Sequence, residues 1–128
     1  MKYNKLKKKI VNLLMVNGNK KTSENLLVKI KKKIQKNFYK KNCKDLVKIG
    51  LINSSPILFF KSIKRKRKKT IKFPFLLNSS LRIFYGLKFI LKNGLYIKKK
   101  PSYIIIQTEL IESANNRGSS AKKKKRFT

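Results

Sequence analysis

The N-terminal third of the chain has the hydrophobic spacing of two helices. From residue 2 to residue 16, apolar side chains recur every three to four positions among lysines, which predicts an amphipathic helix. The Asn-Gly-Asn stretch 17–19 follows, and these residue types readily adopt the left-handed conformation that ends a helix. Thr22 or Ser23 is then expected to cap a second helix. Its apolar stripe comprises Leu26, Leu27, Ile30, Ile34 and Phe38.

Two more segments in the middle of the chain have helical patterns. Residues 44–52 form a short one that stops before Pro56, because proline disfavours a helical conformation in the residue before it. Residues 81–92 follow candidate caps at 78–80 and precede an Asn-Gly pair at 93–94, which is expected to end the helix.

The segment 102–117 has two competing patterns. Its isoleucine run favours a strand, whereas apolar residues at four-residue intervals favour a helix. We expect a helix that Ser102 caps and Gly118 ends. The residues beyond 121 are expected to form a basic tail, since they offer no apolar face long enough to bury.

A hairpin is predicted between the third and fourth helices. Residues 57–63 and 70–77 are apolar, β-branched and aromatic, which is typical of strands, and six consecutive basic residues, 64–69, separate them. Pro74 fits only an edge or bulged strand. The flanking rings could stack on nucleic-acid bases, although at strand spacing they more often pack an arm against its body. These rings are Phe59, Phe60, Phe73 and Phe75.

The patterns together predict one mainly α-helical domain. It is a helical bundle of about five to six helices with a protruding two-stranded β-hairpin arm. The domain is expected over residues 1–121, with the arm at about 57–77 and a basic C-terminal tail at 122–128.

The charge balance indicates a polyanionic partner. The chain has 36 Lys and Arg against 4 Asp and Glu, a formal net charge of +32 at pH 7. Internal ion pairs cannot neutralise this excess, so the free protein repels itself and nucleic acid is the usual partner of such a chain. No apolar stretch approaches the roughly 18 residues of a membrane span.

The residue types give little support for a catalytic site or a metal-binding site. The chain has no His and a single cysteine, Cys43, which removes the commonest acid/base group and leaves no pair of thiols for a disulfide or a metal. Glu109 and Glu112 would share a helical face, but no His or phosphate-binding glycine loop accompanies them. We therefore predict neither an enzyme nor a cofactor.

Several stretches resemble, in order and spacing, the family of small-subunit ribosomal protein seven, of the bacterial and organellar type. The sequence IVNLLMVNGNKKTSE, residues 10–24, is similar to that family's first helix, glycine corner and start of the second helix. GLINSSP, residues 50–56, is similar to the end of its third helix. SANNRGSSAKKK, residues 113–124, resembles the end of its fifth helix and the basic opening of its last. The arm departs from the family, which turns on a glycine pair where this chain has residues 65–69.

The resemblance implies a structural constituent of the small ribosomal subunit. Members of that family bind the 3′ major domain of small-subunit rRNA, help to assemble the head, and lie near the mRNA and tRNA exit site. The implied partners are this rRNA and the neighbouring head and platform proteins, with mRNA and exit-site tRNA as further ones. The residues expected to bind rRNA are Lys8, Lys9, Lys20, Lys21, Lys61, Lys64, Arg65, Lys66, Arg67, Lys68, Lys69, Arg82, Lys122, Lys123 and Lys124.

The composition also suggests in which cellular compartment the protein works. Abundant Lys, Asn, Ile and Phe are typical of a very AT-rich genome, and the first residues lack the Arg and Ser of a transit peptide. We expect an organelle-encoded protein of the mitochondrial ribosome, with a plastid or a reduced bacterial endosymbiont as alternatives.

Two other interpretations of the charge remain at this point. A DNA-compacting or membrane-surface-binding protein would be equally basic, but it would need neither the corner at Gly18 nor a separately built arm. A basic run such as 64–69 can also be a solvated loop or a localisation signal.

Overall fold

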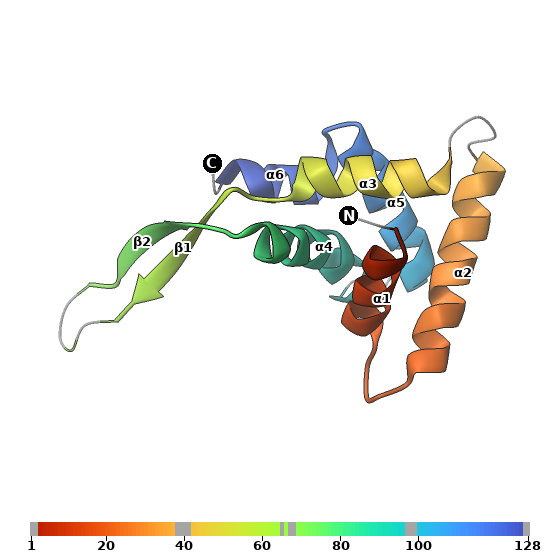
Figure 1. The fold of residues 1–128 in the computed structure, drawn as a ribbon, viewed down its shortest axis with the longest axis horizontal. Helices are drawn as coiled ribbons and strands as arrows, with labels where there is room; N and C mark the ends of the chain where they lie inside the picture. The colour runs from red at the N-terminus through yellow and green to blue at the C-terminus, as the bar shows by residue number, and fades with distance from the viewer. Residues whose placement is uncertain (1–2, 38–41, 65, 67–68, 97–99, 127–128) are drawn as a thin grey trace.

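The computed structural model describes residues 3–37, 42–64, 66, 69–96 and 100–126 (Figure 1). They form six helices and one two-stranded antiparallel sheet, so the predicted helical bundle with a hairpin arm is confirmed. In chain order the elements are α1 (Tyr3–Leu14), α2 (Lys20–Asn37), α3 (Cys43–Ser54), β1 (Leu58–Ile63), β2 (Ile71–Leu76), α4 (Ser79–Tyr96), α5 (Ser102–Ala114) and α6 (Gly118–Arg126).

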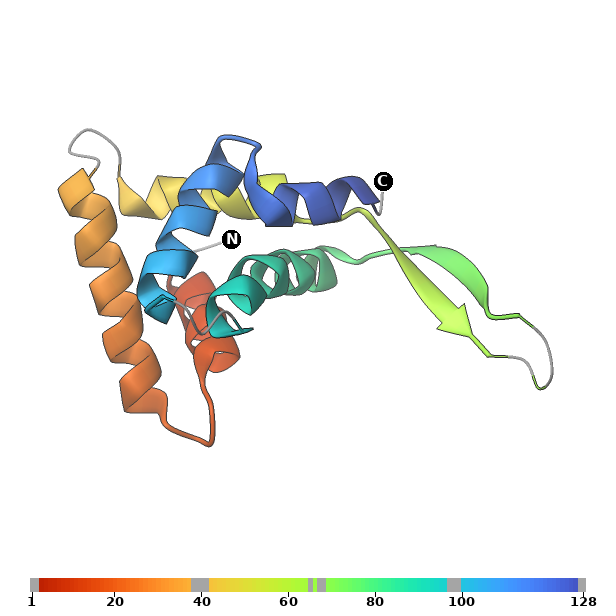
Figure 2. The same ribbon diagram turned by 180° about the vertical axis from the view of Figure 1, so that it is seen from behind.

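Helix α5 holds the helical body together. It packs against α2, α3, α4 and α6, while α1 lies across α2 and α4. The hairpin leaves the body from the end of α3 and returns to the start of α4, and it projects well beyond the helices in both views (Figures 1 and 2). Helix α2 lies at the opposite end of the molecule, whereas the C-terminal end of α6 lies near the base of the arm (Figure 1).

The core is assembled from the apolar stripes of five helices. Each of these helices buries an apolar face, and most lysines of the described residues lie on the exposed or half-buried faces, which is the behaviour of amphipathic helices around a single core. The buried side chains that contact one another are Leu6, Leu14, Ile30, Ile34, Cys43, Leu46, Val47, Leu51, Leu87, Ile90, Leu91, Ile106 and Leu110. Phe38, which was expected to extend the stripe of the second helix, lies outside the described residues.

The corner between α1 and α2 is where the sequence predicted it. Asn17 and Gly18 both have positive φ, 53° and 75°, and turn the chain. The predicted caps are wrong, because α2 already begins at Lys20. The hydroxyls of Thr22 and Ser23 instead donate to carbonyls three residues earlier, each at 2.7 Å, so they bond back along the first turn rather than capping its N–H groups.

Helix α4 runs beyond its predicted end. The Asn-Gly pair at 93–94 was expected to stop it, but the helix continues to Tyr96. A glycine inside a helix costs only about 1 kcal/mol relative to alanine, so it does not end a helix by itself.

The C-terminal region is helical almost throughout. Helix rather than strand is confirmed for α5, although Pro101 and not Ser102 occupies the N-cap position. The helix ends at Ala114, and a corner with Asn116 at φ 56° and Gly118 at φ 88° leads into α6. The expected tail is therefore helical as far as Arg126, where α6 ends. Its hydrophobic pattern gave no sign of this, because the residues that α6 buries are the small Ser120 and Ala121.

The arm is a regular antiparallel ribbon. Its register pairs Leu58 with Leu76 at the base and Ile63 with Ile71 at the outer end. Pro74 lies opposite Phe60, and a two-stranded sheet has only edge strands, so the missing N–H group of the proline is tolerated as expected.

Candidate nucleic-acid interface

Stacked aromatic rings anchor the arm on α4. Phe59 lies over Tyr85 with ring centroids 4.5 Å apart and planes inclined by 23°. Phe75 meets Phe59 at 5.9 Å and 71°, and Phe84 meets Tyr85 at 5.6 Å and 77°. Such pairs contribute about 0.5–1.5 kcal/mol each beyond the area they bury. The packing role expected of the arm's rings is therefore shown for Phe59.

The two faces of the arm differ in chemistry. Successive residues of a strand point to opposite faces, and directly paired residues share a face. We call one face the aromatic face, which comprises Phe59, Lys61, Ile63, Ile71, Phe73 and Phe75. The other is the groove face, which comprises Leu58, Phe60, Ser62, Lys72, Pro74 and Leu76.

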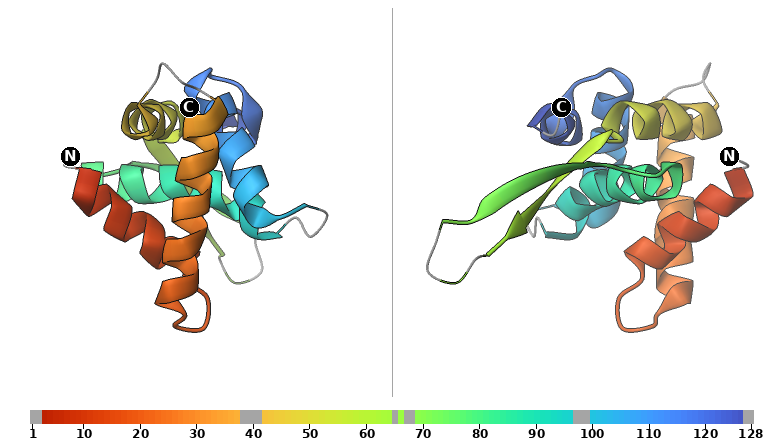
Figure 3. Two further views of the ribbon diagram at one scale, coloured as in Figure 1. Left: turned by 90° about the vertical axis from the view of Figure 1, so that its right-hand side faces the viewer. Right: turned by 60° about the vertical axis from the view of Figure 1, so that its left-hand side comes forward.

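The tip of the arm carries part of the predicted basic cluster. Lys64, Lys66 and Lys69 are exposed, as is Lys61 on the strand below them. The view in which the arm comes forward shows the tip well clear of the helices (Figure 3, right). Arg65, Arg67 and Lys68 lie outside the described residues.

A second basic surface lies in the angle between α1 and α2. An open cleft of about 570 Å³ is lined there by Asn4, Lys7, Lys8, Val11, Asn12, Lys20 and Glu24. The cleft brings together the predicted Lys8 and Lys20, but Lys9 and Lys21 are not among its lining residues. Lys7 was not predicted as a binding residue. The sequence does not give the angle between α1 and α2, and this angle decides which lysines of α1 face the cleft. Glu24 makes the cleft less basic than its lysines alone would.

A third basic surface joins the arm to the end of α6. A groove of about 440 Å³ is lined by Phe60, Ser62, Lys72 and Arg126. Neither cation was predicted as a binding residue. The alternation of β2 would have placed Lys72 beside Ser62, but Arg126 could be placed only once residues 118–126 were known to form a helix against the body.

The lysines of α6 serve more than one purpose. Lys122 is exposed, while Lys123 and Lys124 are half-buried. Lys124 Nζ donates to the carbonyl of Ile52 at 3.4 Å, in the last turn of α3. A cation near the C-terminal end of a helix is favoured by the helix dipole. Lys124 therefore helps to hold α6 on α3 as well as adding to the basic surface.

Arg82, the remaining predicted residue, lies in the first turns of α4. Its Nε atom is buried and has no hydrogen-bond partner within the described part of the chain. A buried donor left unpaired costs about 1–3 kcal/mol. An acceptor from outside the chain would remove this cost, and a phosphate is the acceptor that suits a guanidinium group best.

The second and third motif stretches, residues 50–56 and 113–124, meet in a polar junction between α3 and α5. Asn53 Nδ2 donates to the carbonyls of Ser113 and Ala114 at 3.0 and 3.1 Å, which satisfies the open end of α5. Gly50 faces the same helix so closely that a Cβ atom there would lie 2.7 Å from Ser113 Oγ. GLINSSP and SANNRGSS thus specify one interface, which gives a physical reason for their composition.

The same junction sets the start of α6. Glu109 Oε1 accepts hydrogen bonds from the backbone N–H of Ser120 at 2.7 Å and from Ser119 Oγ at 3.2 Å. Ser54 Oγ lies 3.4 Å from Ser120 Oγ on the other side. A buried carboxylate at a helix N-terminus is favoured by the free N–H groups and by the helix dipole. One of the four acidic residues thus helps to fold a helix whose second half is entirely basic.

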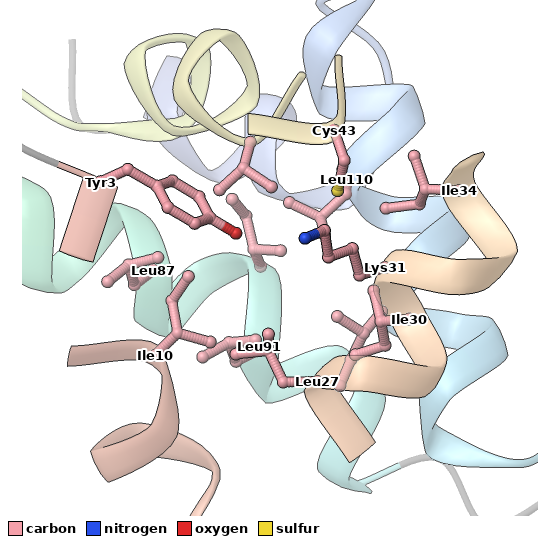
Figure 4. Close-up of a pocket in the computed structure, with 13 residues that line it drawn as sticks. Tyr3, Ile10, Leu27, Ile30, Lys31, Ile34, Cys43, Leu87, Leu91 and Leu110 are labelled. Carbon is pink, nitrogen blue, oxygen red and sulfur yellow. The ribbon is translucent and has the colours of Figure 1, made fainter. Parts of the chain in front are cut away.

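An apolar cavity of about 40 Å³ lies in the core of the body (Figure 4). The Tyr3 hydroxyl, the Cys43 thiol and the Lys31 amine point toward it. Burial raises the pKa of Cys43, an effect that Lys31 partly opposes, and burial together with Cys43 raises the pKa of Tyr3. The space corresponds to about one water molecule. Because the thiol stays protonated, it is a poor nucleophile, and we regard the cavity as a packing gap.

The described residues offer neither a metal-binding cluster nor a membrane-spanning helix. No three His, Cys, Asp or Glu side chains gather there as a group that could hold a metal ion. No helix of that part of the chain combines the length and the apolar character that crossing a bilayer requires.

Comparison with known proteins gives two findings. A family model described as Ribosomal protein S7p/S5e matches residues 1–128. The small ribosomal subunit protein uS7c of Euglena gracilis is 29% identical over 120 residues, which cover 93% of this chain and 75% of that protein.

Proposed function

The chain belongs to the ribosomal protein S7p/S5e family and is a structural constituent of the small ribosomal subunit, and from this premise we propose how it acts there. The family consists of structural ribosomal proteins rather than enzymes. Its partners are therefore ribosomal RNA and other ribosomal proteins.

We propose that the chain binds the 3′ major domain of small-subunit rRNA and helps to assemble the head of the subunit. The observation that carries this proposal is that three separate basic surfaces lie around one helical body: the arm tip, the cleft between α1 and α2, and the groove between the arm and α6. Surfaces on different elements can engage several segments of a folded RNA at once. Phosphate contacts then fix the orientation of the protein on that RNA.

Arg82 supports the same proposal from inside the molecule. It lies close to the base of the arm, in the helix that Phe59 packs against, and its buried Nε atom has no hydrogen-bond partner among the described residues. A phosphate held by Arg82 would connect the arm with the body. The mRNA and the exit-site tRNA are further proposed neighbours of the arm.

We further propose that the protein belongs to the ribosome of an organelle. The similar Euglena gracilis protein is of the chloroplast type, which supports an organelle and favours the plastid over the mitochondrion that the composition suggested. Fractionation of the source cells tests the location directly. Finding the protein in small subunits of plastids supports the proposal, whereas finding it only in cytosolic ribosomes contradicts it.

Binding to RNA tests the function itself. The purified protein should bind a transcript of the 3′ major domain, and its affinity should fall by about 10³–10⁵ between 50 and 200 mM salt if six to ten phosphates are contacted. Equal binding to duplex DNA of the same length would favour the DNA-compacting alternative.

A further inference from the structure

The aromatic face of the arm exposes more apolar surface than anchoring the arm requires. Phe59 is used at the base, where it stacks on Tyr85. Farther out, Phe73 is 54% exposed, and the neighbouring large apolar side chains of this face are 39–46% exposed. These neighbours are Ile63, Ile71 and Phe75. Contiguous exposed apolar side chains of this size mark an interaction site.

The charges around this face select the kind of partner. Lys61 lies directly opposite Phe73, and the exposed Lys64, Lys66 and Lys69 lie beyond the paired strands, at the tip of the arm. The whole chain carries a net charge of +32. RNA supplies flat apolar surfaces and negative charge in the same molecule, which is the combination that proteins bind with aromatic side chains interleaved with cations.

The spacing of the rings further defines the ligand. Phe73 and Phe75 are two residues apart on one strand, about 6.6 Å along it. Stacked bases follow one another at about 3.4 Å, so a base on each ring must be splayed away from its neighbour. Bases of this kind occur in single-stranded loops and bulges, where proteins stack aromatic rings on them.

We propose that the aromatic face binds an unpaired loop of small-subunit rRNA, with one base stacked on Phe73, a second against Phe75, and the intervening phosphate held by Lys61. The inference rests on the proposed function, since it names the RNA element that this part of the surface takes. It assigns the arm a contact by base stacking in addition to contacts with phosphates.

The test compares variants that change the ring but not the charge. Phe73→Leu keeps an apolar side chain of similar size, and Phe73→Trp keeps a ring. The full-length proteins are titrated with the 3′ major domain transcript and with a short oligoadenylate that contains a fluorescent adenine analogue. Phe73→Leu should weaken binding to both RNAs by about 5- to 150-fold, whereas Phe73→Trp should bind within about threefold of wild type. The salt dependence should not change, because no cation is removed.

A matched control separates stacking from a general loss of exposed apolar surface. Leu76→Ala removes a 75% exposed apolar side chain without a ring from the groove face, outside the proposed contact, and it should leave both affinities nearly unchanged. If Phe73→Leu binds both RNAs like wild type, stacking is overturned. If Phe73→Leu binds RNA normally but drops out of assembled subunits, the face docks on a protein and the proposal is likewise overturned.

Wild-type binding distinguishes this inference from the proposed function. If wild type binds the transcript and Phe73→Leu equals it, only the inference fails. If wild type binds oligoadenylate but not the transcript, the assignment to rRNA fails together with the proposed function.

Discussion

At the scale of single residues, the rare acidic and small side chains determine how the basic helices pack. Glu109 is buried and accepts a hydrogen bond from the backbone N–H of Ser120 in the first turn of α6. Gly50 lets α3 approach α5 to within contact of Ser113. Neither residue belongs to a basic surface, yet both decide where those surfaces lie.

The first prediction concerns the charge of Glu109. Glu109→Gln keeps the size of the side chain but replaces a charge-assisted hydrogen bond at a helix N-terminus by a neutral one. The free energy of unfolding should fall by about 1 kcal/mol in urea denaturation at moderate salt. Glu24→Gln, at an exposed position of α2 away from α6, is the control and should change it by less than about 0.5 kcal/mol. Equal losses for both variants would exclude a specific role for Glu109.

The second prediction concerns Gly50. Alanine would gain about 0.5–1 kcal/mol of helix propensity, but its Cβ would lie 2.7 Å from Ser113 Oγ and 3.2 Å from the Leu110 carbonyl. Ser113 is fully buried and its hydroxyl donates to the Leu110 carbonyl at 2.9 Å, a bond that turning away would break, so we expect Gly50→Ala to destabilise the fold by about 1–2 kcal/mol net.

A double variant shows whether the clash is the cause. Ser113→Ala removes the hydroxyl, so the loss in the Gly50→Ala, Ser113→Ala protein should be smaller than the sum of the single losses. Ile52→Ala, at a 66% exposed position of the same helix, is the control and should be nearly neutral. Strict additivity would contradict the proposed contact.

At the scale of elements, the sequence predicted correctly those features that residue types a few positions apart determine. The corner at Gly18 and the two strands around the basic run were found because residue type and period define them over a few positions. The predicted caps of α2, the predicted end of α4 and the predicted tail in place of most of α6 were wrong, because the local signals allowed more than one conformation. Hydroxyls that could cap bonded back instead, a glycine was tolerated inside a helix, and α6 buried serine and alanine rather than an apolar stripe.

The residues of the candidate interface likewise fall into those that a local sequence pattern reveals and those that only the fold brings together. The tip and the corner lysines stand out in the sequence because they are clustered. Lys72 and Arg126 become neighbours only when β2 and α6 are brought together, so no pattern along the chain could have paired them.

The third prediction belongs to the arm. Phe59→Ala removes the ring stacked on Tyr85 and should loosen the base of the arm. In hydrogen exchange, the amides of β1 and β2 should exchange at least about tenfold faster, corresponding to about 1.4 kcal/mol of lost local stability. Amides of α5 should be unchanged. The control, Leu76→Ala, removes a 75% exposed side chain of the groove face, and equally fast exchange in that variant would rule out anchoring by Phe59.

At the scale of the whole molecule, the charge makes the fold and its partner inseparable. A net charge of +32 destabilises the compact free chain through self-repulsion, and neutralisation on RNA relieves it. The arm carries part of this charge, and it projects away from the helical body (Figure 1), so that it can enter folded RNA without disturbing the helices. The central claim is therefore that the tip binds rRNA phosphates while the body remains an independent scaffold.

The salt dependence of rRNA binding by a tip variant tests that claim most directly. Arg65, Lys66, Arg67 and Lys68 are changed together to Ser, and four exposed body lysines, Lys29, Lys32, Lys36 and Lys48, are changed to Gln in a charge-matched control. The tip variant should bind the 3′ major domain transcript more weakly, and the slope of log affinity against log salt should fall by about three to four units if each cation meets a phosphate. The control should keep a slope closer to that of wild type, and the helical body should unfold as before in both. A tip variant with wild-type affinity and slope, or one whose body melts, would contradict the account.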